Sequence, residues 1–325
     1  MSPKTQTLYS KNVAIEFYQD RYTHGYMDEW PAEKKQRVFE VIRNLPLPEC
    51  GDALDFGCGN GVFTDVIRQA LPTGWKISGS DISEVAVTNA RKRYPECNFF
   101  SADDKEFVNK KFDLVFTHHV LEHVFNLQEV FAEIVDRLKK NAAMLHILPC
   151  GNPGSLEHQI CLLRKDGINP DQENRFFFED EGHVRRLTTD QMVNICSKYG
   201  FSLTEEFYSG QYFGAFNWVT QTGLEFVKTF TDPSNAVNEL AANKIRNLRK
   251  KMIALWFLRF PACCLENKFR KTNKTIRDYI LMFIGLPIYI LTKPADFFLK
   301  KKALQEWNCR KTNRNGSEMY LFFHR

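Results

Sequence analysis

The sequence lacks the cysteine spacing that is typical of zinc ribbons and disulfide-stapled scaffolds. Its nine cysteines are scattered along the chain, they include no C-x-x-C pair, and only Cys263 and Cys264 are adjacent. Structural zinc sites and disulfide frameworks need regularly spaced cysteines, so both classes are disfavoured. This distribution indicates reduced thiols in a cytosolic protein.

The sequence also has no apolar run of the roughly 20 residues that cross a bilayer. Its longest apolar clusters cover 252–265, which contains Arg259, and 279–291, which contains a Gly-x-Pro break. The amino-terminal stretch MSPKTQTLYSKN is polar and has no apolar core of a signal peptide. We therefore expect a cytoplasmic location and no transmembrane helix.

Acidic residues are scarce beyond residue 240. Residues 241–325 hold 19 Lys and Arg against 5 Asp and Glu, whereas residues 1–240 hold 25 against 34. A basic carboxyl-terminal part predicts an anionic partner, which is a membrane surface, a nucleic acid or a phosphorylated substrate.

Strand-like and helix-like segments alternate along most of the chain, which is typical of a parallel sheet with crossover helices. Helices are expected first, in 11–44, where Tyr18, Tyr22, Tyr26 and Trp30 recur every four residues. The expected strands are 52–56, 75–81, 97–103, 112–120, 142–150, 201–209 and one within 317–325, and the expected helices between them are about 61–70, 83–94, 126–139 and 189–199. The fold class is therefore α/β, with a doubly wound, mostly parallel sheet of seven strands.

Three glycines follow the first strand directly, in the stretch ALDFGCGNGVF (53–63). Gly57, Gly59 and Gly61 stand at alternate positions after Asp55. Glycine costs backbone entropy inside regular structure, so three together indicate a requirement of the backbone. A turn without side chains can bring its main chain against a bound cofactor, beside the amino terminus of a helix.

This order of apolar strand, Asp55, GxGxG turn and helix resembles the first motif of class I S-adenosylmethionine-dependent methyltransferases. A nicotinamide or flavin site would use the spacing GxGxxG instead. Asp81 and Asp103 end the second and third expected strands, and FDLVFTHHVLEHV (112–124) resembles the fourth-strand block of the family. The segment GHVRRLT (182–188), followed by a helix and YGF, resembles methyltransferases of small and lipid-like acceptors, including the ubiquinone-biosynthesis type.

The resemblance covers about residues 40–209 and the last strand. It implies a Rossmann-like sheet whose last strand is antiparallel, with S-adenosylmethionine as the cofactor. It also implies that the glycine turn surrounds the methionine part of the cofactor, that Asp81 holds the ribose hydroxyls and that Ile82 packs on adenine. The cofactor-binding residues expected on this basis are Asp55, Gly57, Cys58, Gly59, Asn60, Gly61, Asp81, Ile82, Asp103 and His118.

A catalytic base is needed only if the acceptor must lose a proton. The candidates are His118, His119, His123 and His183, of which His119 and His183 are the expected catalytic residues. His119-x-x-Glu122-His123 also resembles a metal motif, Glu-x-x-Glu-His, of some quinone and small-RNA methyltransferases, whose positions share one face if the segment is helical. Because His119 replaces the first Glu, magnesium is disfavoured, and the expected site contains no metal. Alternatively, Glu122 and His123 cap the following helix.

The expected domains follow from these motifs. They are an amino-terminal helical lid (1–45), a cofactor-binding core (46–209) with a substrate loop (151–187), a basic, apolar helical insertion (210–316) and the final core strand (317–325).

The insertion combines apolar clusters with dense Lys and Arg. One interpretation is a helical cap whose apolar faces pack on the core. Another is a monotopic contact, with the apolar face among lipid headgroups and the basic face on anionic lipid. Nucleic-acid binding is less favoured, because no RNA module is recognisable.

The sequence therefore predicts an S-adenosylmethionine-dependent methyltransferase for a small or lipid-linked acceptor, most readily at a hydroxyl. It predicts a cytoplasmic protein with peripheral association to an anionic membrane surface through 240–316. The alternatives are an RNA methyltransferase and a non-catalytic binding module with the same fold. The oligomeric state stays open.

Overall fold

The computed structural model describes residues 11–270 and 274–325. The chain divides into two compact units. The sheet unit comprises the described residues up to Pro149, Asp180–Glu206 and Met319–Arg325, and the helical unit comprises Cys150–Glu179 and the described part of Phe207–Glu318. The polar amino-terminal stretch that argued against a signal peptide lies mostly outside the described residues.

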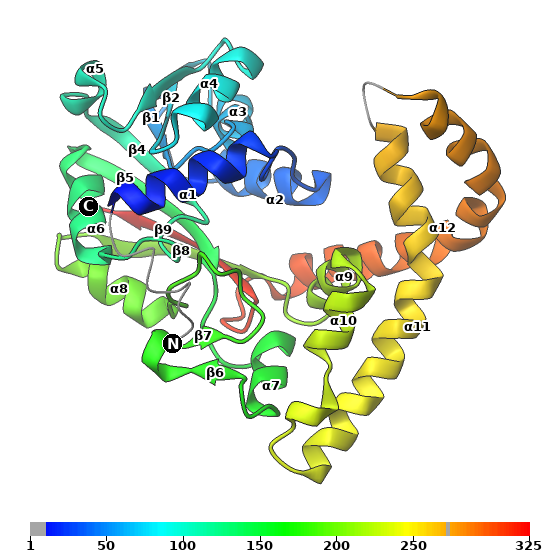
Figure 1. Ribbon diagram of the computed structural model, residues 1–325. Coiled ribbons are helices and arrows are strands. Elements are labelled where there is room, and N and C mark those ends of the chain that lie inside the picture. The colour runs from blue at the N-terminus through cyan, green and yellow to red at the C-terminus, as the bar shows by residue number, and fades with distance from the viewer. Residues whose placement is uncertain (1–10, 271–273) are drawn as a thin grey trace. The chain divides into compact units, whose positions relative to one another are not determined.

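A seven-stranded sheet carries the expected α/β fold, with strand order β3-β2-β1-β4-β5-β9-β8 (Figure 1). Pairings β1–β2, β2–β3, β1–β4 and β4–β5 are parallel. The strands are β1 (Cys50–Phe56), β2 (Gly74–Asp81), β3 (Asn98–Ser101), β4 (Phe112–His118), β5 (Leu138–Pro149), β8 (Ser202–Ser209) and β9 (Glu318–His324). Parallel strands align their carboxyl ends at one edge, where ligands of such sheets bind.

The last strand returns to the sheet in the opposite direction, as expected. Ser317 N–H donates to the Ser209 carbonyl, whereas Thr204 Oγ1 donates to the Phe322 carbonyl, so β8 and β9 run antiparallel. Tyr320, Leu321 and Phe323 are fully buried, because the sheet gives β9 neighbours on both sides.

Seven helices of the sheet unit lie within its described residues, and the amphipathic ones bury one face. They are α1 (Lys11–Thr23), α2 (Ala32–Arg43), α3 (Val62–Ala70), α4 (Glu84–Arg93), α5 (Lys105–Val108), α6 (Leu127–Asp136) and α8 (Thr189–Ser197). The α8 helix begins with a capping box in which Thr188 and Gln191 satisfy each other's backbone donors, and Gly200 follows it with a φ of 80°.

The helical unit has a core of its own, formed among others by Phe216, Val219, Phe230 and Met252. Its elements are α7 (Leu156–Leu162), β6 (Ile168–Asn169), η2 (Pro170–Gln172), β7 (Arg175–Phe176), α9 (Phe213–Thr222), α10 (Leu224–Phe230), η3 (Pro233–Asn235), α11 (Glu239–Arg270) and α12 (Ile276–Arg310). The segment 151–187 is therefore less irregular than expected, because it contains α7 and the β6–β7 pair.

Several expected boundaries need correction. The third and fourth strands end at Ser101 and His118, before the expected ends, whereas β5 begins earlier, at Leu138. The α1 helix ends at Thr23, so Tyr26 and Trp30 do not continue a helical stripe. The Gly-x-Pro sequence does not break its helix, since α12 continues through Pro287.

Candidate cofactor and acceptor site

The glycine turn joins β1 to α3 in a backbone shape that side chains oppose. Gly57, Gly59 and Gly61 have φ values of 77°, 51° and 79°, in the left-handed region. The Gly57 and Cys58 N–H groups donate to the Ser80 carbonyl at 2.8 and 2.9 Å. A Cβ at Gly57 would lie 2.5 Å from Val120 Cγ2, so only glycine fits there.

A tyrosine of α1 lies against the middle of this turn. A Cβ added to Gly59 would lie 2.6 Å from the Tyr22 hydroxyl. Burial and the nearby Asp81 charge raise the pKa of Tyr22 well above its usual value, so the phenol stays protonated and can donate a hydrogen bond. Sequence reasoning read this tyrosine as one of a packing stripe and did not place it at the turn.

Asp81 ends β2, as expected, and its carboxylate faces the turn. Its Oδ2 accepts from the Gly59 N–H at 2.9 Å, and its Oδ1 accepts from the Ser83 N–H at 2.8 Å. Burial raises the pKa of Asp81, although both backbone bonds oppose this effect. A carboxylate has about four acceptor positions, so Asp81 can accept from a further donor beyond these backbone groups.

Asp55 lies one position from the end of β1 and is almost fully buried. Thr64 Oγ1 donates to its Oδ2 at 2.7 Å. Burial raises the pKa of Asp55 to about 7, and the charge of the neighbouring Asp81 adds to the rise. Asp55 and Asp81 therefore act on one another across the first two strand ends.

The remaining expected cofactor residues occupy three environments. Cys58 and Asn60 are buried in the turn, and Asn60 Nδ2 donates to Asp28 Oδ1 at 2.7 Å. Ile82 is half-buried directly after β2. Asp103 is exposed in a turn two residues beyond β3, so it does not end that strand as expected.

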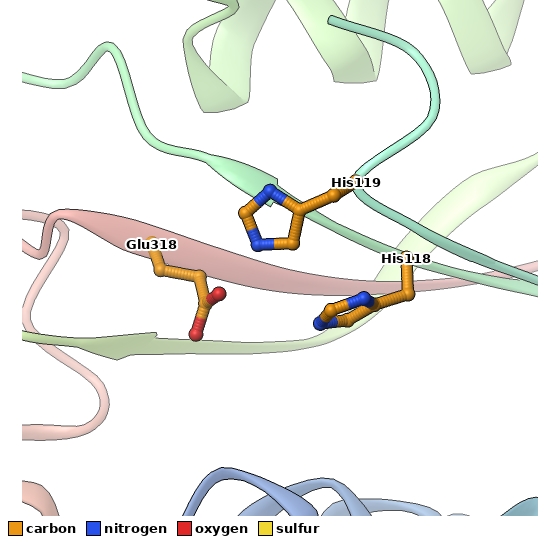
Figure 2. A group of neighbouring side chains, drawn as sticks. All are labelled: His118, His119 and Glu318. Atoms are coloured by element: carbon orange, nitrogen blue, oxygen red, sulfur yellow. The ribbon is translucent and has the colours of Figure 1, made fainter. Parts of the chain in front are cut away.

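His118 and His119 lie where β4 ends, and Figure 2 shows their rings there. The same figure shows Glu318, the residue at which β9 begins. The His118 ring lies 3.9 Å from the Phe63 ring and 4.8 Å from the Trp30 ring, centroid to centroid. Burial lowers the pKa of His118 well below its usual value. Its Nε2 is a buried atom with no hydrogen-bond partner among the described residues.

His119 leaves the strand with a φ of 53°, an unusual value for a residue with a side chain. Its Nδ1 lies 2.7 Å from Glu122 Oε1. Burial acts to raise the pKa of Glu122, but His119, together with His123 and His183, outweighs it and the pKa falls to about 2. Glu122 is therefore a carboxylate that accepts from His119 Nδ1–H, which leaves the other ring nitrogen of His119 as an acceptor.

The three residues His119, Glu122 and His123 do not share a helical face. Residues 119–123 form a turn, and α6 begins only at Leu127 with Asn126 as its cap. The motif therefore fails as a helical ligand set, and Glu122 and His123 do not cap the helix either.

The residues that lie close enough to share a metal ion are Glu122, His123 and His183, so His183 takes the place that the motif gives to His119. One ligand atom each of Glu122, His123 and His183 lies within 4.8 Å of the others, and the His123 and His183 ring centroids are 4.5 Å apart. Burial lowers the pKa of His123 to about 4, so its ring is neutral near pH 7. Such a nitrogen-rich set could hold zinc or another transition ion better than magnesium.

The segment that carries His183 is tied to this end of the sheet. The Val184 N–H donates to the Glu122 carbonyl at 2.8 Å, and the buried Arg185 donates to the carbonyls of Leu121, Val124 and Phe125. Arg21 of α1 forms a two-point ion pair with Asp180, at 2.9 and 2.7 Å. Sequence reasoning missed Arg21 and Arg185, because nothing in their local pattern indicates such distant partners.

Comparison with known families shows to which family the chain with this strand-end arrangement belongs. A family model described as "Methyltransferase domain" matches residues 24–206, which include the glycine turn, Asp81 and His183. The chain belongs to this methyltransferase family. It is a class I enzyme that uses S-adenosylmethionine.

Curated relatives of this methyltransferase include two trans-aconitate 2-methyltransferases. The Escherichia coli O7:K1 enzyme is 28% identical over 201 residues, which cover 59% of this chain and 75% of that enzyme. The Shigella flexneri serotype 5b enzyme is 25% identical over 199 residues, with the same coverage. Among solved structures, magnesium protoporphyrin IX methyltransferase from Synechocystis PCC 6803, crystallised with bound SAH, is 19% identical with a TM-score of 0.43, covering 61% of this chain and 92% of that one.

Proposed function

We propose that this methyltransferase transfers a methyl group to a hydroxyl of a small or lipid-linked acceptor. The observation that carries the proposal is the His119–Glu122 pair at the carboxyl end of β4. A carboxylate acceptor needs no base, whereas a hydroxyl must lose its proton as it is methylated. A carboxylate-oriented imidazole with one basic nitrogen supplies that base.

The residues around the glycine turn fit S-adenosylmethionine. The left-handed glycines let the turn pass close to Val120 and Tyr22, and Asp81, which faces the turn, would accept from the ribose hydroxyls. Asp55 and the backbone of Gly57–Gly61, with Cys58 and Asn60, would hold the methionine part. Ile82 and Asp103 would lie at adenine, and the buried His118 Nε2 would meet the cofactor at the β4 end.

Bound S-adenosylmethionine would supply the methyl group, on a sulfonium whose sulfur is a good leaving group, for transfer to the acceptor oxygen. His119 takes the hydroxyl proton on the ring nitrogen that does not face Glu122. Glu122 stabilises the imidazolium that results, since it is already ionised. His183 is the second proposed catalytic residue and orients the acceptor beside His123.

The acceptor class rests on chemistry and on the relatives. The trans-aconitate 2-methyltransferases are named for a small molecule, which supports a small acceptor. The basic, apolar character of 241–325 supports a lipid-linked one, modified by a cytoplasmic enzyme that associates peripherally with a membrane.

Methyl-labelled cofactor tests the acceptor class directly. The protein is incubated with labelled S-adenosylmethionine and a cell lysate, which is then separated into lipid, RNA, protein and small-molecule fractions. We expect label in the lipid or small-molecule fraction, in a form that mild alkali does not release as an ester. Label in RNA would instead establish an RNA methyltransferase and overturn the proposal.

His119→Asn tests the base. We expect kcat to fall by about 10²- to 10⁴-fold, with the Kd for S-adenosylmethionine unchanged, because the change removes proton transfer but not cofactor contacts. The exposed His324 gives a matched control, since His324→Asn removes an imidazole far along the chain from the β4 end. Equal kcat values for both variants would eliminate His119 as the base.

A further inference from the structure

The two long helices of the helical unit, α11 and α12, form a pair that we call the hairpin, and Figure 1 shows α12 curving beside α11. Met252 and Leu299 of this pair pack into the core of the helical unit, but many of its other large apolar residues are exposed. In 257–260 and 279–291, which together form the apolar face, exposure reaches 82% at Phe283 and 80% at Leu291. Many large apolar side chains exposed on one pair of helices are typical of a surface that binds something.

The inside of the hairpin holds charge. Arg259 of α11 and Asp296 of α12 are 1% and 0% exposed, and Arg259 Nη2 lies 2.7 Å from Asp296 Oδ1. Arg259 also donates to Asn217 and Thr220 of α9. Lys293 Nζ and Lys300 Nζ lie 2.9 and 3.2 Å from Glu266. These polar contacts hold α9, α11 and α12 together and leave the apolar side chains to face outward.

Basic residues flank the apolar segments. Lys250 and Lys251 precede the α11 segment, Arg277 precedes the α12 segment, and Lys300–Lys302 follow it. Of the acidic residues near these segments, Asp278 and Asp296 are buried, and Glu266 pairs with Lys293 and Lys300. The exposed charge around the apolar face is therefore positive.

Membrane insertion accounts for α12 better than a place in a soluble core. Among the described residues, α12 is the one helix long and apolar enough to cross a membrane, and only 6% of its apolar window is buried. A core helix would be buried, and a signal sequence would lie near the amino terminus. The uncharged run 279–292 spans only about 21 Å at 1.5 Å per residue, which is shorter than the ~30 Å hydrocarbon core.

We propose that the hairpin inserts its apolar face into one leaflet of an anionic membrane, with its flanking lysines and arginines at the lipid phosphates. A run of this length reaches into one leaflet without crossing the bilayer. Anionic lipid complements the exposed positive charge, whereas a second copy of the same face would place like charges together. Pro287 and Pro294 lie inside α12, which curves in Figure 1, and proline is a common cause of helix bending.

This inference deepens the proposed membrane association but does not depend on methyl transfer, so its test uses binding alone. The full chain is mixed at low salt with vesicles of phosphatidylcholine containing 30 mol% phosphatidylglycerol, and flotation measures the bound fraction. We expect the protein to float with these vesicles and about tenfold less with phosphatidylcholine alone. A chain that stays in solution with anionic vesicles overturns the proposal.

Substitutions that place charge on the apolar face distinguish insertion through that face from nonspecific binding to vesicles. F283E/I284E removes two strongly exposed apolar side chains, and we expect at least tenfold weaker vesicle binding. Leu240→Glu is the matched control, because Leu240 is 68% exposed on α11 but lies outside the apolar face. An equal loss of vesicle binding in both variants overturns the assignment of the apolar face. So does a wild-type protein that does not bind vesicles but forms a dimer, if F283E/I284E dissociates that dimer.

Depth distinguishes insertion from adsorption by charge. Trp256 of α11 packs on Phe260 at 4.4 Å between ring centroids, beside the apolar face. Lipids brominated near the top of the acyl chain should quench wild-type fluorescence, and Trp256→Phe should remove most of that quenching. Flotation without Trp256-dependent quenching means surface adsorption and overturns insertion. S-adenosylmethionine binding, measured in parallel, reports separately on the methyltransferase.

Discussion

The sheet unit and the hairpin arrange the same kinds of residue in opposite ways. In the sheet unit, apolar side chains such as Leu54 and Phe116 are fully buried, and the candidate site residues Asp81 and His118 lie at strand ends. In the hairpin, an ion pair is buried and phenylalanine, isoleucine and leucine face outward. Apolar surface is stable where it is removed from water. The apolar side chains of the sheet unit are covered within the chain, whereas those of the hairpin are exposed, and we propose that a lipid membrane covers them.

The largest effect should come from filling the glycine turn of the sheet unit. Gly57→Ala places a Cβ 2.5 Å from Val120 in a left-handed backbone, and we expect a loss of about 2–5 kcal/mol in unfolding free energy and no measurable S-adenosylmethionine binding. Urea unfolding and calorimetric titration measure both.

Gly200→Ala is the control for this change. Gly200 has nearly the same φ, 80°, but its added Cβ would meet only Arg325 Nε at 3.8 Å. Gly200→Ala should lose only the unfolding free energy that a left-handed backbone costs a residue with a side chain, roughly 1–2 kcal/mol, and its affinity for the cofactor should not change. Equal behaviour of the two variants would show that close approach at Gly57 is unimportant.

The next effect should come from breaking the ion pair inside the hairpin. Arg259→Met leaves Asp296 buried, and we expect a loss of about 3 kcal/mol, at the low end for a broken buried pair because Lys300 stays 3.2 Å from Asp296. Thermal unfolding monitored by circular dichroism measures it.

The double variant R259M/D296L should recover much of that stability, since it leaves no uncompensated charge. If it is as unstable as R259M alone, the pair does not act as a unit. If R259M does not lower the unfolding free energy, the buried ion pair does not stabilise the hairpin, and the contrast between its polar inside and its exposed apolar side chains has no energetic basis.

A smaller effect is expected where the sheet unit binds the cofactor. Asp81→Asn keeps an acceptor for the Gly59 N–H but loses the charge, and it should weaken S-adenosylmethionine binding by about 1–3 kcal/mol, or roughly 5- to 150-fold. Asp113→Asn is the control, because Asp113 lies at the amino end of β4 and pairs with Lys139. An unchanged Kd for Asp81→Asn would mean that the acid holds only the turn.

The smallest effect concerns acid sensitivity of the sheet unit. Burial lowers the pKa of His146 to about 3. The unfolded chain therefore takes up the proton first, and stability falls as the pH drops from about 6.5 towards 3. His146→Gln should remove about 1.4 kcal/mol of the loss between pH 7.5 and pH 5.5, measured by urea unfolding. His324→Gln, at an exposed site, should leave the slope unchanged; a flattened slope there would contradict the assignment.

Much of the fold and the cofactor was predictable from local signals. The GxGxG turn, Asp81 at a strand end and the apolar strands depend on short-range chemistry, and the sheet, the antiparallel last strand, the family and the cofactor are confirmed. The roles of the individual site residues stay predictions. The strand ends near Ser101 and His118 were missed, because apolar character continues past the residue at which strand pairing stops.

The acceptor side was harder to predict. The spacing of His119, Glu122 and His123 gives one shared face only if the segment is helical, but His119 adopts a left-handed conformation and the segment turns instead. His183 joins Glu122 and His123 from some sixty residues away along the chain, and Tyr22 reaches Gly59 from the first helix. No local sequence pattern predicts these long-range contacts, because they depend on where the sheet brings distant segments together.

The sequence by itself determined the alternation of strands and helices, the glycine turn with its acid and the basic, apolar character of the last part, since each depends on neighbouring residues. Only the tertiary structure decided that His119 pairs with Glu122 and that Arg259 pairs with Asp296. The same structure decided that the apolar residues of the hairpin face outward. Burial and contacts between residues distant in the sequence depend on the packing of the whole folded chain, and they cannot be read from neighbouring residues.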